Sequence, residues 1–439
     1  MTEEENTESR ETEEHYRPKW LVAAPFLDPV PRLTRHQWRI IGLLGVACIF
    51  DQYDLHLFSL ALVQIQADLA IPDGQIGDLG AIVRLGALPA FFFGLLADRM
   101  GRRRVLLVTI VLYTVLTGAT AFAQDTMTFV VLQFFARMFA VAELMLAYVV
   151  VTEELDPADR GWGVGALTAL AACGSGLAIV LFGFVDILPF GWRALYLVGL
   201  IPLACVAWMR RTLPETQRFV DHQSEREERK TSWIRPVIDL ARMYPGRILV
   251  VAVVIFLLNF TENAAGFFGP KYLQEAHGWL PWQYSVMGFF GGAIGIVGGP
   301  YAGRLSDRYG RKKVVAAFLF AQPLLVIAFY QVSGWILAPL WVAMIFAGMA
   351  GGVVLSAVGN ELFPTSYRTT ASGARMIVGT IGGALGLITE SILYGIFDSH
   401  WNAVSIMVIG ALFAPFIVLY FFPETSGKEL EEISPEKTA

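Results

Sequence analysis

Long apolar segments separated by short polar links run along almost the whole chain. Twelve such segments cover 38–66, 77–97, 104–123, 127–153, 161–187, 192–211, 246–274, 283–305, 314–331, 337–361, 367–397 and 401–422. Each is close to the ~20 residues that a helix needs to cross roughly 30 Å of hydrocarbon. The pattern predicts an all-α membrane protein with twelve transmembrane helices.

Composition supports the same fold class. The chain has 439 residues, of which 55% are hydrophobic and only 16% are charged, whereas a soluble protein carries about 25% charged residues. The first 14 residues hold seven Glu and one Arg. That stretch is typical of a disordered tail and lacks the positive start and apolar core of a signal peptide.

The two halves of the chain repeat each other. The segment GLLADRMGRRR at 94–104 returns as GRLSDRYGRKK at 303–313, so that Asp307 follows Asp98 by 209 positions. Pro-Glu-Thr at 214–216 and again at 423–425 keeps the same offset. Several matches at one offset indicate a duplicated six-helix unit with a substrate site between the halves.

This repeat sets the expected domain boundaries. We expect a disordered acidic tail over 1–37, a six-helix bundle over 38–211, a cytoplasmic linker over 212–245, a second six-helix bundle over 246–422 and a cytoplasmic tail over 423–439. The linker is charged and predicted to be partly helical. The fifth, eighth and eleventh segments are rich in glycine, which indicates either close static packing or helix surfaces that slide during transport.

The basic residues predict an orientation. Arg and Lys cluster at 32–39, 99–104 and 308–313, whereas the alternate links, such as those near 68–73 and 398, contain almost none. The positive-inside rule places the basic links and both termini in the cytoplasm. We therefore expect a multi-pass protein of a cell membrane, with a bacterial inner membrane as the favoured location and the lipid bilayer as its surroundings.

These motifs resemble the major facilitator superfamily, and the resemblance runs from Trp38 to Ile433. The G-x-L-[AS]-D-R-x-G-R-[RK] loop is present in both halves. The Pro-Glu-Thr motifs and Glu-Leu-Phe-Pro-Thr at 361–365 are similar to those of sugar and organic-ion porters, and Asp51-Gln-Tyr-Asp54 looks like the D-x-x-D of aromatic-acid:proton symporters. The resemblance implies two six-helix bundles that rock about a central site by alternating access, in a monomer.

The resemblance also implies a gating role for charged residues at the cytoplasmic helix ends. Asp98 and Asp307 are expected to cap helix N-termini and to pair with Arg, which holds the cytoplasmic side shut. The alternative is that the basic residues only set the topology. The expected gating residues are Asp98, Arg99, Arg102, Asp307, Arg308, Arg311, Glu154, Arg160, Glu361 and Arg368.

Two acids within the first segment are candidates for proton coupling. Asp51 and Asp54 are three residues apart and share a helix face, and ionisable residues inside a span are functional candidates by default. Their mutual repulsion favours proton uptake by one of them. Glu143 and Arg137 of the fourth segment complete the set, although Val141 stands where a family R-x-x-x-G motif has Gly. The alternative is a structural pair between an acid and a buried Arg.

The candidates for substrate binding are polar or aromatic residues inside the predicted spans. Arginine suits a carboxylate because its forked guanidinium matches that geometry, whereas the amides of the seventh segment can bind a polar substrate or simply join helices. Aromatic neighbours such as His56 and Phe58 either form an aromatic wall of the substrate site or only pack against other helices. The set is Tyr53, Arg84, Arg137, Asn259, Glu262, Asn263, Arg375 and Glu390.

The sequence favours proton-coupled symport of a small organic anion, such as an aromatic carboxylate, with protons as the coupling ion. The alternatives are sugar or polyol transport, drug antiport and a nutrient sensor on a transporter scaffold. We expect no enzyme, since the chain shows no nucleophile–base constellation or phosphate loop. Three cysteines scattered through apolar segments give no metal site. We expect no cofactor and no nucleic-acid partner.

Overall fold

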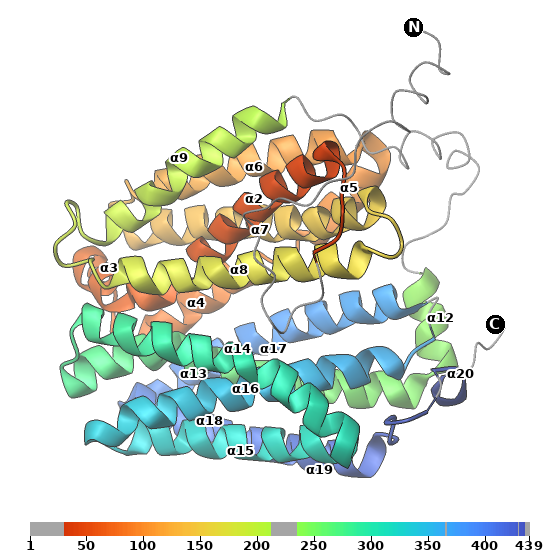
Figure 1. Ribbon diagram of the computed structural model, residues 1–439. Coiled ribbons are helices and arrows are strands. Elements are labelled where there is room, and N and C mark those ends of the chain that lie inside the picture. Colours follow the sequence, from red (N-terminus) through yellow and green to blue (C-terminus); the bar gives the residue numbers. More distant parts are fainter. Residues whose placement is uncertain (1–29, 212–234, 365–366, 429, 435–439) are drawn as a thin grey trace, which may run out of the picture.

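The computed structural model describes residues 30–211, 235–364, 367–428 and 430–434. Helices dominate both halves of the chain (Figure 1). The first half contains α2 (Arg35–Leu60), α3 (Leu62–Leu69), α4 (Ile76–Leu85), α5 (Phe91–Met100), α6 (Arg102–Thr120), α7 (Thr126–Glu154), α8 (Arg160–Phe182) and α9 (Trp192–Arg210). The second contains α12 (Arg235–Met243), α13 (Pro245–His277), α14 (Pro281–Tyr309), α15 (Arg311–Gln331), α16 (Leu337–Glu361), α17 (Arg368–Phe397), α18 (His400–Ile409), α19 (Ala414–Phe421) and α20 (Leu430–Ile433).

Within the described residues, 11 helical segments are long and apolar enough to cross a membrane. The remaining predicted span, 77–97, is divided between α4 and α5 by turns at 86–90. Gly86 lies directly against the backbone carbonyl of Phe134, and a side chain there would push α7 away. Pro89 has no backbone N–H to continue a helix. The predicted all-α membrane fold is confirmed, with a break inside the second span.

Short polar sequences begin several of the helices. The Thr34 side chain accepts a hydrogen bond from the backbone N–H of Gln37, and the Gln37 side chain accepts one from Thr34, which forms a capping box for α2. Asp125 caps α7, and Ser399 caps α18. These caps fix where each helix starts.

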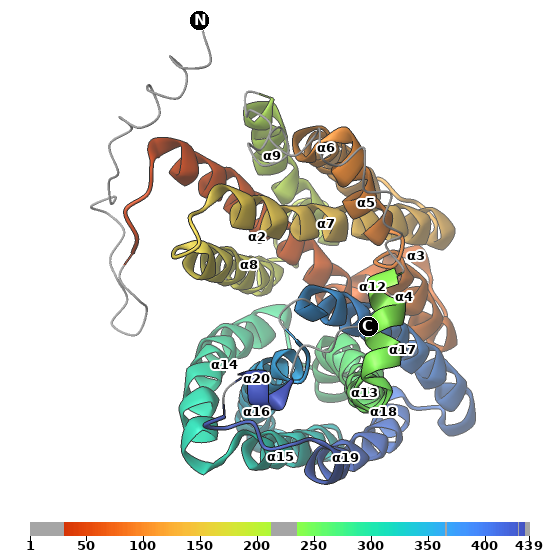
Figure 2. The ribbon, with the colours of Figure 1, turned by 90° about the vertical axis from the view of Figure 1, so that its right-hand side faces the viewer.

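The helices form two bundles with matching internal packing (Figure 2). In the first half α2 packs along α8, and in the second half α13 packs along α17, so the first and fifth spans of each unit are paired. Gly174 brings α8 onto the backbone carbonyl of Ile49, and Gly386 brings α17 onto the backbone carbonyl of Phe260. Glycine at these positions allows a close approach that any side chain would prevent.

The two bundles meet mainly where α4 packs on α17 and α8 packs on α14. The loops at Gly101 and Gly310 lie at one end of the molecule, named here the basic end. The opposite end, named the Asp73 end, carries α3 and the short 3-10 helix η1 (Asp73–Gln75). Figure 1 has the basic end on the right and the Asp73 end on the left.

The expected domain boundaries fall partly outside the described residues. The tail 1–37 is described only from residue 30, and the linker 212–245 only from residue 235. The last part of the linker forms α12, and the final tail includes α20. The boundaries themselves stay predictions.

Candidate functional site

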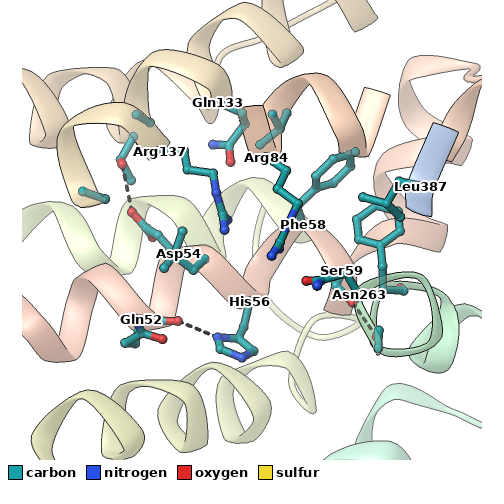
Figure 3. A pocket seen from close by; sticks show the side chains of 18 of the residues that line it. Gln52, Asp54, His56, Phe58, Ser59, Arg84, Gln133, Arg137, Asn263 and Leu387 are labelled. Carbon is teal, nitrogen blue, oxygen red and sulfur yellow. Dashed lines mark hydrogen bonds between the residues drawn. The ribbon is translucent and has the colours of Figure 1, made fainter. Parts of the chain in front are cut away.

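A cavity of about 480 Å³ lies between the two bundles, within the size range of small-molecule sites. Helices α2, α4, α6, α7, α13 and α17 supply its walls (Figure 3). The lining residues are Gln52, Asp54, Leu55, His56, Phe58, Ser59, Gly80, Val83, Arg84, Tyr113, Thr117, Gln133, Ala136, Arg137, Ala140, Glu262, Asn263, Gly266, Phe267 and Leu387. Of the predicted substrate-binding residues, Arg84, Arg137, Glu262 and Asn263 are among them.

Two guanidinium groups project into the same part of the cavity. Arg84 comes from α4 and Arg137 from α7 (Figure 3). Within the described residues, neither belongs to an ion pair with an N–O distance of 4.0 Å or less, and the buried Nε of each has no hydrogen-bond partner. Because no acidic side chain of the described residues forms an ion pair with either guanidinium, both can bind an anion in the cavity.

Asp54 is the carboxylate that faces the cavity from α2. Its Oδ2 accepts hydrogen bonds from Tyr113 at 2.6 Å and from Thr117 at 2.8 Å, and its buried Oδ1 has no partner within the described residues. Neither Arg137 nor Arg84 neutralises it at ion-pair distance. Asp54 thus lines the cavity, while its second oxygen is buried on the side of Gly199 in α9 without a hydrogen-bond partner within the described residues.

Asp51 points instead into the first bundle, where it is fully buried. Glu143 and Arg210 form an ion pair beside it, and Thr109 donates a 2.8 Å hydrogen bond to Glu143. Both carboxyl oxygens of Asp51 lack a hydrogen-bond partner within the described residues. Asp51 therefore lies close to a buried ion pair without a direct contact to its guanidinium.

The second bundle contributes polar groups from α13. Glu262 and Asn263 line the cavity. Asn259 lies one turn away, and its side-chain amide donates to the backbone carbonyl of Ile255, while Asn263 donates to the carbonyl of Asn259 at 2.7 Å. Part of the hydrogen-bonding capacity of these amides is thus used within α13.

Four predicted substrate-binding residues do not line this cavity: Asn259, one turn away on α13, and three residues that lie elsewhere. Tyr53 is fully buried and donates a hydrogen bond to the backbone carbonyl of Leu195, which ties α2 to α9. Arg375 contacts the Asn360 side chain at 3.1 Å, nearer the basic end. Glu390 lies at the Asp73 end, 2.6 Å from Nδ1 of His400.

A buried lysine joins the two bundles at the Asp73 end. Lys271 of α13 has a side chain only 1% exposed, and its ammonium lies 2.9 Å from Asp73, 2.6 Å from Glu275 and 2.5 Å from the side-chain oxygen of Gln66. Asp73 and Gln66 belong to the first half, whereas Glu275 belongs to the same helix as Lys271. The lysine therefore ties the halves together by charge.

Further contacts extend this connection, and together with the Lys271 contacts we name them the outer lock. The hydroxyl of Ser391 accepts a 3.0 Å hydrogen bond from the backbone N–H of Asp78, and Gln64 donates one of 2.8 Å to Gln274. Nε2 of His400 lies 3.5 Å from Asp73. The outer lock holds α3, η1 and α4 against α13, α17 and α18.

The outer lock changes the acidity of Asp73, which lies outside the membrane-spanning helices. Burial by itself acts to raise the pKa of this carboxyl group, but hydrogen bonds from Gln66 and Lys271 and the positive charge of Lys271 outweigh it. The pKa of Asp73 therefore lies below its ordinary value. The closed lock favours the ionised carboxylate.

The repeated spacing of charges at the basic end gives one ion-pair network in each half. Arg102 lies 2.9 Å from Asp98 and 2.9 Å from Glu153, and it is buried. Glu154, one of the predicted gating residues, does not join this network and lies 3.7 Å from His36. The Asp98–Arg102 pair is present, while Gly101, not Asp98, occupies the N-cap of α6.

The second half repeats this arrangement. Arg311 pairs with Glu361 and lies 3.7 Å from Asp307. Glu424 of the second Pro-Glu-Thr motif accepts a 2.9 Å hydrogen bond from the backbone N–H of Arg311. Gly310 has φ of 97°, so glycine allows this sharp turn between α14 and α15. Asp307, like Asp98, does not cap the helix that follows it.

The other predicted gating residues bind backbone or face outward. Arg160 donates to the carbonyl of Leu155 at 3.1 Å, and Arg368 donates to that of Asn360 at 3.1 Å. Arg308 lies over the ring of Tyr309, and Arg99 is exposed. Arg160 and Arg368 thus fix the loops that follow α7 and α16.

Four functional candidates were not predicted from the sequence: Arg210, Lys271, His400 and Glu153. Arg210 and Lys271 are charged residues at the ends of apolar segments, where basic residues are usually taken as membrane-flanking anchors. The sequence alone does not show that these two side chains are buried. Both have side chains only 1% exposed, and a buried cation requires an acidic partner.

Comparison with known proteins agrees with the predicted family. The model of the Major Facilitator Superfamily matches residues 43–387 and 296–438. The cis,cis-muconate transport protein of Acinetobacter baylyi is 28% identical over 387 residues, which cover 82% of this chain and 89% of that protein. The benzoate transport protein of the same organism is 24% identical over 440 residues, with coverages of 92% and 93%.

A solved structure has the same fold. The inward open conformation of the xylose transporter XylE from E. coli matches with a TM-score of 0.73 and 17% identity, and the match covers 90% of this chain and 99% of that one. At this identity the likeness concerns the fold alone. It confirms the predicted architecture of two pseudo-symmetric six-helix bundles.

Proposed function

The chain belongs to the major facilitator superfamily, a family of membrane transporters for small molecules, and on that premise we propose that it is a secondary active transporter for a small organic anion, driven by protons. The favoured cargo is a carboxylate with an aromatic or otherwise unsaturated body. The relatives named for muconate and benzoate transport support this class.

One observation carries the proposal: Arg84 and Arg137 line the central cavity without an acidic partner at ion-pair distance within the described residues. Guanidinium groups bind carboxylates through paired, charge-assisted hydrogen bonds. Phe58 and Phe267 also line the cavity, with their ring centroids 5.2 Å apart, and provide an apolar wall for the body of the substrate.

The charges of the cavity support coupling to protons. Arg84 and Arg137 are balanced by Asp54 and Glu262 when both acids are ionised. A bound monoanion then leaves one uncompensated negative charge, which is costly in a low-dielectric site. A proton on Asp54 or Glu262 restores neutrality, so we expect one proton to enter with each monoanion.

We assign proton exchange with the cavity to Asp54 and a supporting role to the trio of Asp51, Glu143 and Arg210. Asp54 lines the cavity, and one of its carboxyl oxygens has no hydrogen-bond partner within the described residues. The trio holds two buried carboxyl groups and one guanidinium, so a proton on either acid makes its net charge zero. The trio can therefore gain or lose a proton when Asp54 in the cavity does.

We further propose that the basic end faces the cytoplasm and that the cell membrane is the location. The clustering of Arg and Lys at 99–104 and 308–313 supports this orientation. The outer lock then closes the external side, and alternating access requires that it opens when the basic end closes. The Arg102 and Arg311 networks are the proposed gates of the cytoplasmic side.

Uptake into proteoliposomes tests the function. The vesicles receive an inward proton gradient and radiolabelled benzoate, a sugar such as xylose, or an organic cation. We expect benzoate to accumulate, a protonophore to abolish accumulation, and Arg84→Gln and Arg137→Gln to reduce uptake at least tenfold. Arg375→Gln is the matched control, because Arg375 is partly buried but does not line the cavity.

A sugar remains the second candidate. The amides of Gln52, Gln133 and Asn263 line the cavity and can bind hydroxyl groups. Accumulation of xylose with no uptake of carboxylates, and with full activity in Arg84→Gln and Arg137→Gln, would replace the anion by a sugar. Efflux of the organic cation against an opposing proton gradient would favour the drug antiporter instead.

A further inference from the structure

Arg84 reaches across the boundary between the two bundles. Its α4 backbone belongs to the first half, but its guanidinium lies against Gly383 of α17 and beside Asn263 of α13, both in the second half. A Cβ atom on Gly383 would lie 2.7 Å from Cζ of Arg84 and closer still to Nε, and 2.8 Å from Nδ2 of Asn263. Any side chain at position 383 would therefore displace Arg84.

The neighbouring glycines of α17 have a different task. Gly382 and Gly386 lie against the backbone carbonyls of Phe256 and Phe260 on α13, so side chains there would force two helices apart. At Gly383 the closest atoms belong to the long side chain of Arg84, which can move without any shift of the helices. Gly383 thus serves the position of a cavity residue and is not required by helix packing.

We propose that Gly383 is a specificity-determining position, because the absence of a side chain there lets Arg84 hold a substrate carboxylate between the two halves, beside Asn263. The proposal rests on the proposed transport of anions. A carboxylate held in this place contacts both bundles, so its binding favours their approach. A side chain at position 383 would withdraw the guanidinium toward the first half and weaken the hold on short carboxylates most.

The first test compares two glycine-to-alanine variants in proteoliposomes. Gly383→Ala displaces Arg84, whereas Gly266→Ala adds a methyl group to the same cavity where nothing lies within 4 Å. We expect Gly383→Ala to raise the KM for benzoate about tenfold with little change in the maximal rate, and Gly266→Ala to raise it less than threefold. Equal effects of the two variants would assign the loss to cavity volume and overturn the proposal.

A double-mutant cycle tests whether Arg84 carries the effect. In an Arg84→Ala background the Nε and Cζ atoms that meet position 383 are absent, so we expect Gly383→Ala to change the KM less than twofold. An undiminished tenfold effect in that background would contradict the positioning role. Gly395→Ala is the control for folding, because it places an alanine in open space on the same helix, α17. Equal melting temperatures of Gly383→Ala and Gly395→Ala would exclude a folding defect.

A chemical readout separates this proposal from the proposed function. Phenylglyoxal modifies accessible arginines, and mass spectrometry reports its rate at Arg84 without any substrate. We expect a changed rate at Arg84 in Gly383→Ala and an unchanged rate in Gly266→Ala. If the wild type carries no carboxylate but this rate changes, the positioning is correct and the cargo is wrong. If the rate does not change, the positioning itself fails.

Discussion

Asp51 and Asp54 lie three residues apart on α2, yet they face different surroundings. Asp54 borders the central cavity and accepts hydrogen bonds from Tyr113 and Thr117. Asp51 is sealed inside the first bundle beside the Glu143–Arg210 ion pair. The two acids therefore offer separate tests of coupling and of structure.

Replacing Asp54 by Asn should uncouple transport from protons. The amide cannot exchange a proton with the cavity, so we expect accumulation of benzoate under a proton gradient to fall at least tenfold. Exchange of labelled for unlabelled benzoate at equal pH should continue, since it needs no net proton movement. Asp398→Asn is the control, because Asp398 lies outside the cavity in a left-handed conformation that Asn also adopts. Loss of exchange together with accumulation would point to a binding role.

The Glu143–Arg210 pair should matter for stability. Removal of one partner leaves a buried charge without compensation, which typically destabilises a protein by about 3–5 kcal/mol. We expect the melting temperature of the Arg210→Met variant in detergent to lie well below that of the wild type. The double variant Glu143→Met, Arg210→Met should recover much of the loss. A double variant as unstable as the single one would show that packing, and not charge, dominates here.

The outer lock should control access from the Asp73 end. In a cysteine-free background, Ser391→Cys places a thiol inside the interface between α4 and α17. Asp73→Asn removes a contact across the halves and should increase labelling by a membrane-impermeant maleimide about fivefold, corresponding to ~1 kcal/mol for a half-exposed pair. Glu275→Gln, which breaks a contact within α13, should leave the labelling unchanged. Equal labelling in both variants would remove Asp73 from the gate.

The pH dependence of the same labelling has a defined sign. The pKa of Asp73 is lowered in the closed lock, so the closed state binds fewer protons than the open one. Closure by this contact is complete above the ordinary aspartate pKa of about 3.9 and is lost as the pH falls through the lowered pKa. We expect no increase in labelling through Asp73 between pH 7 and 5, and an increase below about pH 4. Asp73→Asn should remove that acid step.

Two adjacent acids at the basic end should differ in their effect on gating. Glu153 contacts buried Arg102, whereas Glu154 contacts partly exposed His36. We expect Glu153→Gln to reduce the initial rate of uptake about fivefold and Glu154→Gln to reduce it less than twofold. Surface abundance should be equal for both. The opposite ranking would restore Glu154 as the gating acid.

Much of the fold could be predicted from the sequence because the decisive signals are local or duplicated. The length of each apolar segment fixes a membrane-spanning helix, and the return of Asp98 as Asp307 reveals two related halves. The break at Gly86 and Pro89 was hidden, since an apolar run of the right length does not show where a helix is interrupted.

The site was only partly predictable because it depends on helix rotation. Each residue turns a helix by about 100°, so a small difference in rotation separates a residue in the cavity from one inside a bundle. Arg84, Arg137 and Asn263 lie in the cavity, whereas Tyr53 and Glu390 do not. The spacing of polar residues along one helix does not show which of its faces the neighbouring helices cover.

By itself the sequence determined the membrane class, the duplicated bundles, the basic loops and the set of charged residues within the spans. Only the tertiary structure decided how those charges are divided: Asp54 to the cavity, Glu143 to Arg210, and Glu390 to His400. The physical reason is that a charge buried in apolar surroundings requires a partner. Partners come from helices far apart in the chain and meet only when the bundles pack.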